Sequence, residues 1–193
     1  LKMVARRRGQ DLMATVGDIV AQYRKVIREF PEYGGRIYVN IDDTGVGGGV
    51  TDRLREVKRE EKVNRLFVIP INAAEKIETD TKEGKEAAER YNNLTTHMWA
   101  VLRDLLENRQ IEIEDDAETF AQISVRKYFM ASNGKLELES KKEMKKRGAR
   151  SPDRGDAAAL SVYLGKVKKY TGSAPGKEVI SRLNKSSYWQ NGR

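Results

Sequence analysis

Two stretches of the sequence place aspartates where they could act as metal ligands. Asp153 and Asp156 stand in SPDRGDAAAL (residues 151–160), and Asp42 lies near the end of the apolar segment RIYVNIDD (36–43). Residues three apart on a helix share a face, where two carboxylates repel each other unless a cation compensates. Carboxylate oxygens suit Mg²⁺ and Mn²⁺. If folding brings Asp42 beside Asp156, the pattern predicts a divalent-cation site capable of phosphodiester hydrolysis.

A capping role is the alternative for part of the second motif. Ser151 is suited to an N-cap, Pro152 to the first helical position, and Asp153 to the first turn, where the helix dipole favours negative charge. Asp156 lies in the second turn, where the dipole effect has faded. Capping therefore explains Asp153 but not Asp156.

The glycine-rich segment TGVGGGV, residues 44–50, follows Asp42 and Asp43 at a predicted strand end. In open α/β sheets, functional groups gather beyond the carboxyl ends of the strands. Adjacent strand residues point to opposite faces, so we expect only one of the two aspartates, Asp42, to face a site. A purely structural turn remains open, because glycine permits sharp turns. A phosphate cradle is disfavoured, because Val50 stands where a dinucleotide motif has glycine or alanine.

A basic segment lies directly before and within the second aspartate motif. Its side chains could neutralise phosphates without reading base sequence, although a solvated charged face is the alternative. The residues are Lys141, Lys142, Lys145, Lys146, Arg147, Arg150 and Arg154. The whole chain has 37 Lys and Arg against 29 Asp and Glu, a net charge of +8, which favours polyanionic partners.

Composition excludes several classes of site. The 193 residues contain no cysteine and a single histidine, His97, so disulfides, thiolate metal sites and multi-histidine zinc sites are excluded. We expect structural roles for His97 and for Trp99. No apolar run approaches the ~20 residues of a membrane span, so we expect a soluble intracellular protein without a membrane partner.

The elements that would position these groups alternate in type. Hydrophobic spacing predicts a strand at 1–5, a helix from Asp11 to about Phe30, a strand at 36–43, a helix after the glycines and a strand at 65–71. This order is typical of an α/β sheet with parallel strands. Farther on, the sequence predicts a polar connection at 72–90 with a helical second half, helices at 91–107, 116–125 and 151–169, and a β-hairpin turning at Asn133-Gly134. We expect one domain over 1–169 and a tail over 170–193 that is either loosely ordered or packed on a neighbouring molecule.

Four segments, in this order and spacing, resemble the nuclease domain of the large terminase subunit of tailed bacteriophages. They are NIDDTGVGGGVTDRLRE, YNNLTTHMWAVLRDLLE, ISVRKYFMASNGKLELESKKEMKKRG and SPDRGDAAAL, and the resemblance covers about residues 5–167. It implies an RNase H-like mixed sheet flanked by helices, with an added β-hairpin. It also implies two Mg²⁺ or Mn²⁺ ions and cleavage of concatemeric double-stranded viral DNA at the start and end of capsid filling. The implied partners are DNA, the terminase ATPase domain, the small terminase subunit and the portal, at the procapsid in the cytoplasm of the infected bacterial host.

The same resemblance assigns roles to individual residues. Asp42 matches the family's aspartate at the end of the strand before TG, Asp156 matches the aspartate that opens DA, and Asp153 matches an auxiliary position; all three would be metal ligands. Asp43 has no assured counterpart. The family's first metal-binding aspartate lies on the first strand of the sheet, which no segment of this sequence matches. We therefore expect the sequence to begin partway through a longer polypeptide.

Two functions from other classes stay open at this point. A non-catalytic DNA-binding or packaging scaffold module would bind DNA regardless of divalent ions. A nucleotide-binding enzyme that uses DTGVGGG would bind ATP saturably. Fold resemblance alone does not decide among these functions.

Overall fold

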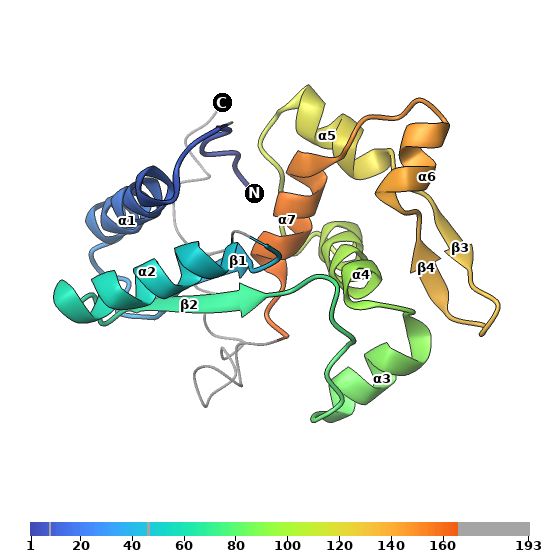
Figure 1. The fold of residues 1–193 in the computed structure, drawn as a ribbon, viewed down its shortest axis with the longest axis horizontal. Helices are drawn as coiled ribbons and strands as arrows, with labels where there is room; N and C mark the ends of the chain where they lie inside the picture. Colours follow the sequence, from blue (N-terminus) through green and yellow to red (C-terminus); the bar gives the residue numbers. More distant parts are fainter. Residues whose placement is uncertain (8, 46, 166–193) are drawn as a thin grey trace.

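A pair of parallel strands separates two hydrophobic cores (Figure 1). The computed structural model describes residues 1–7, 9–45 and 47–165. Strand β1 (Ile37–Asp42) pairs with β2 (Leu66–Ile71), so that Asp42 and Ile71 end the two strands side by side. Side chains alternate along β2: Leu66 and Val68 enter the first core, and Ile69 and Ile71 enter the second.

Two amphipathic helices build the first core. They are α1 (Leu12–Glu29) and α2 (Gly47–Glu60). Asp11 is the N-cap of α1, and its side chain accepts a hydrogen bond from the Ala14 backbone N–H. Val16 and Val20 of α1 and Leu54 and Val57 of α2 lie buried with the strand residues. The predicted helix–strand–helix–strand order over this part of the chain is confirmed.

The second core, on the other side of the strand pair, is mainly helical. Its elements are α3 (Lys82–Arg90), α4 (Leu94–Glu107), α5 (Ala117–Ser124), the hairpin strands β3 (Tyr128–Met130) and β4 (Leu136–Leu138), and α6 (Lys141–Lys146). Helix α7 (Asp153–Val162) lies between the two halves and packs against α4, α5 and β1 (Figure 1). Of the described helices, none combines the length and apolar character needed to cross a membrane.

The predicted strand at 1–5 is wrong. Residues 1–7 form no strand, and the Leu1 carbonyl accepts one hydrogen bond from the Glu114 backbone N–H at 2.8 Å. An apolar alternating pattern forms a strand only when a neighbouring strand supplies a ladder of hydrogen bonds. Leu1 instead packs its side chain against the second core.

The predicted hairpin is confirmed, but its loop differs in detail. The Ala131 N–H donates to the Lys135 carbonyl at 2.8 Å, and the Gly134 N–H donates to the Ala131 carbonyl at 2.9 Å. Gly134 has φ +76°, whereas Asn133 keeps a negative φ. The loop is therefore a three-residue turn with glycine in the left-handed position, and not a two-residue turn in which both residues have positive φ.

Both ends of α7 differ from the prediction. The helix begins at Asp153, after an N-cap Pro152 that makes no side-chain capping bond, and the Ser151 hydroxyl donates to the Asp153 carboxylate at 2.7 Å instead of capping the helix. The helix ends at Val162, and Asn40 of β1 donates its side-chain N–H groups to the carbonyls of Leu160 and Tyr163, both at 2.7 Å. The predicted continuation to 169 and the tail at 170–193 lie outside the described residues, apart from 163–165, which are not helical.

Candidate active site

A cavity of about 580 Å³ lies between α7, the end of β1 and the start of α6. Asp42, Asp153 and Asp156 all line it, although Asp42 is more than a hundred residues from the other two. The remaining wall comes mainly from α4, with Thr95, Met98 and Trp99, and from Arg126 and Lys141. Folding thus brings the three aspartates selected from the sequence to one cavity. Within the described residues, no group of three or more His, Asp or Glu side chains is close enough to hold a metal ion.

The end of β1 turns its two aspartates in different directions. Asp42 is exposed at the cavity, and its Oδ1 accepts a hydrogen bond from the Thr44 backbone N–H at 3.1 Å. Asp43 instead accepts a hydrogen bond from the hydroxyl of Thr51, a buried residue of α2, at 2.7 Å. Asp42 is therefore the aspartate that borders the cavity, as the alternation of strand side chains predicts.

The glycine-rich turn has a structural explanation at one position. A Cβ at Gly47 would overlap the backbone carbonyl of Asp42, so α2 can begin this close to β1 only with glycine there. Gly45 has φ +71°, a conformation that glycine adopts without strain. The turn needs no phosphate to account for these two glycines, and it places Asp42 at the cavity rim.

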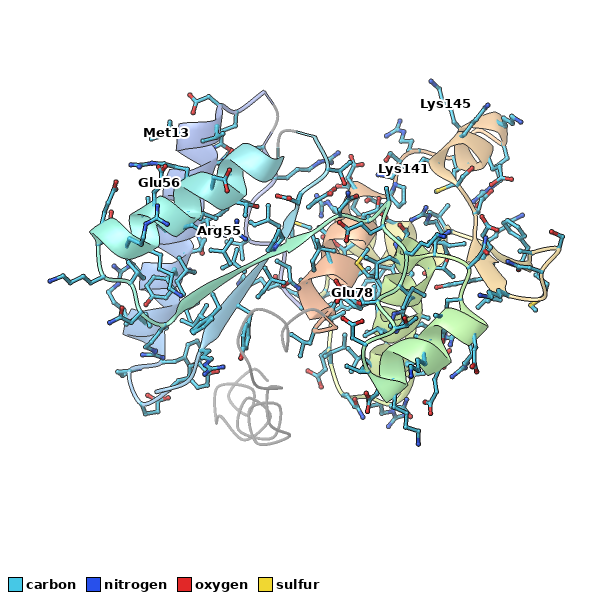
Figure 2. The ribbon with its side chains drawn as sticks, turned by 60° about the horizontal axis from the view of Figure 1, so that its bottom comes forward. Met13, Arg55, Glu56, Glu78, Lys141 and Lys145 are labelled. Atoms are coloured by element: carbon cyan, nitrogen blue, oxygen red, sulfur yellow. The ribbon has the colours of Figure 1, made fainter. Side chains whose placement is uncertain are left out.

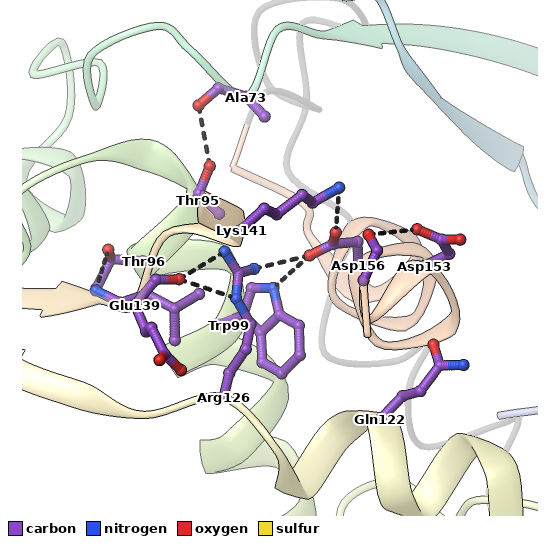
Figure 3. Close-up of polar contacts among 12 residues, drawn as sticks. Ala73, Thr95, Thr96, Trp99, Gln122, Arg126, Glu139, Lys141, Asp153 and Asp156 are labelled. Atoms are coloured by element: carbon purple, nitrogen blue, oxygen red, sulfur yellow. Dashed lines mark hydrogen bonds and ion pairs between the residues drawn. The ribbon is translucent and has the colours of Figure 1, made fainter. Parts of the chain in front are cut away.

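Asp156 is held from three directions (Figure 3). Its side chain is 26% exposed, and its Oδ1 accepts hydrogen bonds from Trp99 Nε1 at 3.0 Å and from Arg126 Nη1 at 2.8 Å. Its Oδ2 is enclosed and accepts no hydrogen bond of good geometry, but the Lys141 ammonium lies 2.8 Å away as an ion pair. One carboxylate oxygen is thus saturated by fixed donors, and the other faces a single flexible cation.

Arg126 is the most deeply buried charge of the site, with a side chain only 4% exposed. Burial lowers the pKa of Arg126, while the Asp156 carboxylate acts in the opposite direction. The guanidinium also donates to the Glu139 carbonyl through Nε at 3.2 Å and Nη2 at 2.9 Å. A buried charge is stable only when it is paired and hydrogen-bonded, and Arg126 meets both conditions.

The Trp99 indole packs directly on the first turn of α7. A Cβ at Gly155 would lie 2.7 Å from Trp99 Cη2, and the Arg126 guanidinium sits 5.0 Å above the indole ring. Trp99 is therefore part of the cavity wall as well as of the core. Its N–H donor was the only sequence signal for this role, because a buried indole N–H usually finds an acceptor. Nothing in the sequence singled out Arg126.

We expect Gly155→Ala to destabilise the protein by about 1–3 kcal/mol, because the added methyl would force the indole or α7 to move. Gly17→Ala is the matched control: Gly17 also lies inside a helix, and a Cβ there meets no atom within 4 Å. The control should be neutral or stabilising by about 0.5–1 kcal/mol. Urea unfolding of both variants measures the difference, and equal effects would contradict the close packing of Trp99 on Gly155.

Asp153 borders the cavity from the outer side of α7. It is exposed, accepts a hydrogen bond from Ser151, and lies 3.8 Å from Arg6 Nη2. None of these contacts is buried, so its carboxylate can reorient at small cost.

His97 does not line the cavity. It stacks on Tyr91 with ring centroids 5.3 Å apart, and burial lowers the pKa of its imidazole, as expected for a neutral packing residue.

The structure divides the basic segment into paired and unpaired cations. Arg147 binds the Glu139 carboxylate with two hydrogen bonds of 2.6 and 2.7 Å, and Arg154 pairs with Asp116 and Glu118. Lys141 pairs with Asp156. The other four cations are exposed and make no ion pair with any described residue: Lys142, Lys145, Lys146 and Arg150. Figure 2 shows Lys145 projecting outward from α6.

Helix α6 presents these lysines because its start is well defined. Ser140 and Glu143 form a capping box, in which each side chain accepts a hydrogen bond from the other residue's backbone N–H. Met144 is fully buried and anchors the inner face. A six-residue helix is marginal by itself, so the capping box and this anchor fix the direction of the lysines.

The arrangement of helices and strands is similar to that of solved nuclease domains of a phage large terminase subunit. The chain is similar to the nuclease domain of the large terminase subunit gp2 of bacterial virus Sf6, with 20% sequence identity, a TM-score of 0.54, and coverage of 70% of this chain and 68% of that chain. A lysine-to-alanine variant of the same domain with manganese gives a TM-score of 0.55 at 20% identity, covering 70% of this chain and 69% of that chain. That variant has also been solved with manganese and beta-thujaplicinol, with a TM-score of 0.54.

No family model matches the chain, and no curated protein sequence matches it. The likeness to solved structures confirms the resemblance recognised in the sequence at the level of the fold. Fold likeness at this identity does not transfer chemistry, so the function has to be argued from the site.

Proposed function

We propose that this domain is a divalent-metal-dependent endonuclease of a viral DNA-packaging terminase, and that it cleaves concatemeric double-stranded DNA by two-metal phosphodiester hydrolysis. The observation that carries the proposal is the convergence of Asp42, Asp153 and Asp156 on one cavity. The fold supports it, because the similar domain of virus Sf6 is a terminase nuclease domain that has been solved with manganese.

The donor set at the cavity fits a divalent cation. Asp156 Oδ2 is enclosed without a hydrogen bond and faces the Lys141 ammonium, so the protein already places positive charge at this oxygen. Asp42 and Asp153 are exposed and offer oxygen donors at the same cavity. Their side chains would have to turn toward Asp156 to complete a ligand set, because no three acids of the described chain are close enough at present. Bound Mg²⁺ or Mn²⁺ would supply Lewis-acid stabilisation and an activated water.

The protein's side chains would bind the cations, neutralise charge and contact the DNA. Asp156, Asp42 and Asp153 would hold the cations, and Lys141 would neutralise Asp156 in their absence. The unpaired cations of α6 and the following loop, Lys142, Lys145, Lys146 and Arg150, would hold the DNA backbone without reading its sequence. Arg147 and Arg154, already paired with acids, would support the site more than they contact DNA.

By resemblance, this activity would belong to a larger packaging machine. Its partners would be the terminase ATPase domain, the small terminase subunit and the portal, at the procapsid in the infected cell. These partners are part of the proposal.

Nicking of supercoiled plasmid tests the proposal directly. We expect conversion to nicked and linear DNA with Mn²⁺ or Mg²⁺ and none in excess chelator. Cleavage that continues in chelator would exclude the metal mechanism. DNA binding without cleavage, at an affinity indifferent to divalent ions, would favour a non-catalytic scaffold module.

A further inference from the structure

The two oxygens of Asp156 have different surroundings, and the difference comes from two residues outside the aspartate motifs. Oδ1 receives Trp99 Nε1 from α4 and Arg126 Nη1 from the segment before β3. Oδ2 receives neither. Both donors are fixed, because Trp99 is 3% exposed and the Arg126 side chain is 4% exposed. A carboxylate held in this way by one oxygen cannot rotate freely about its last torsion.

We propose that Trp99 and Arg126 are positioning residues, which fix Asp156 by Oδ1 so that Oδ2 faces the cavity, and that Arg126 also ties this carboxylate to helix α6. The inference rests on the proposed function, in which Asp156 Oδ2 binds a divalent cation. Neighbours that hydrogen-bond to a metal-ligating side chain set its orientation and its affinity for the metal.

Trp99 acts on Asp156 through both its ring and its N–H. The ring packs on Gly155, which lets α7 approach α4 closely enough for the 3.0 Å bond between Nε1 and Asp156 Oδ1. The hydrogen bond from Trp99 to Asp156 therefore depends on glycine at 155 as well as on the indole. Replacing the indole by phenyl would remove the donor together with the outer ring atoms that lie against Gly155, so a control for lost packing is needed.

Arg126 connects Asp156 to α6 through a continuous polar chain. Its guanidinium bonds both Asp156 and the Glu139 carbonyl, and Glu139 directly precedes Ser140, the N-cap of α6. The Glu139 carboxylate in turn is held by Arg147, the residue at the other end of α6 (Figure 3 shows the part from Asp156 to Glu139). Because both ends of α6 are joined to this series of hydrogen bonds, a shift of the lysine-bearing helix would be transmitted to the Asp156 carboxylate.

Two conservative substitutions separate positioning from general stability. Trp99→Phe removes the N–H donor, and Arg126→Lys keeps the charge but cannot bond Asp156 and Glu139 in the same forked geometry. We expect each to weaken Mn²⁺ binding by about 10–100-fold in calorimetric titrations of the DNA-free protein. DNA affinity in chelator should stay within about twofold of the original protein for Trp99→Phe, because the cations on α6 are untouched.

Leu102→Val is the matched control, because Leu102 is a buried residue of α4 that does not line the cavity. It should lower thermal stability and leave Mn²⁺ affinity unchanged. If Trp99→Phe and Arg126→Lys bind Mn²⁺ as tightly as the original protein, the positioning role is wrong even when cleavage is intact. If the original protein binds Mn²⁺ and the two variants bind it more weakly, but none cleaves DNA, the positioning role stands and the nuclease proposal fails. An original protein that binds no Mn²⁺ would overturn both.

Discussion

Replacing Asp42 or Asp156 by asparagine should reduce Mn²⁺-dependent plasmid cleavage by about 10²–10³-fold. An amide has the shape of the carboxylate but no charge, so it cannot offset a divalent cation at the cavity. Metal ions contribute several kcal/mol of transition-state stabilisation, and each 1.4 kcal/mol corresponds to about a tenfold change in rate. Initial rates of plasmid nicking at saturating Mn²⁺ measure the effect.

The neighbouring aspartate provides the control for this prediction. Asp43 carries the same charge one residue along, but it bonds Thr51 and does not line the cavity. Asp43→Asn keeps an oxygen acceptor for Thr51 and should therefore cleave at close to the original rate. Equal losses in the Asp42 and Asp43 variants would mean that the effect comes from the glycine-rich turn and not from a ligand.

The Asp42→Asn and Asp156→Asn variants should differ in stability. Asp42 is exposed at the end of β1, so Asp42→Asn should change the free energy of unfolding by less than about 0.5 kcal/mol. Asp156→Asn leaves the buried Arg126 guanidinium without its charged partner and should cost about 1–3 kcal/mol. Cleavage has to be compared at a temperature where both variants are folded.

The sequence predicted those parts of the site that depend on local pattern. The apolar run before Asp42 marks a strand, and Asp156 lies one turn into a helix of small residues, so both positions follow from element boundaries. Their meeting at one cavity follows from the packing of α7 against β1. Within that packing, Asn40 donates to the carbonyls of Leu160, in the last turn of α7, and of Tyr163, its C-cap, a contact that sequence spacing does not reveal.

The partners of each charge could not be predicted, because they depend on contacts between distant segments. Arg154 lies inside the aspartate motif but pairs with Asp116, 38 residues earlier, and Arg126 reaches Asp156 across 30 residues. The seven cations of the basic segment look alike in the sequence. Only the fold separates Arg147 and Arg154, which are paired with acids, from the lysines that project from α6.

This separation predicts which cations matter for DNA binding. Replacing Lys142, Lys145 and Lys146 together by alanine should weaken binding to double-stranded DNA by about 100-fold at 0.1 M salt. Each lysine that neutralises a phosphate makes the negative slope of log affinity against log salt steeper by about 0.9. The slope of the triple variant should therefore be shallower by about 2.7. Binding is measured in chelator by fluorescence anisotropy across a series of salt concentrations.

A matched variant removes the same charge elsewhere. Arg28, Arg59 and Lys85 are exposed on α1, α2 and α3 and make no ion pair with a described residue, so replacing all three by alanine changes the net charge equally. If α6 holds the DNA backbone, the salt slope of this control should stay close to that of the original protein. Equal losses of slope in the two triple variants would show that net charge alone attracts DNA. The triple alanine variant of α6 should still cleave plasmid at low salt, because Asp42, Asp153 and Asp156 are untouched.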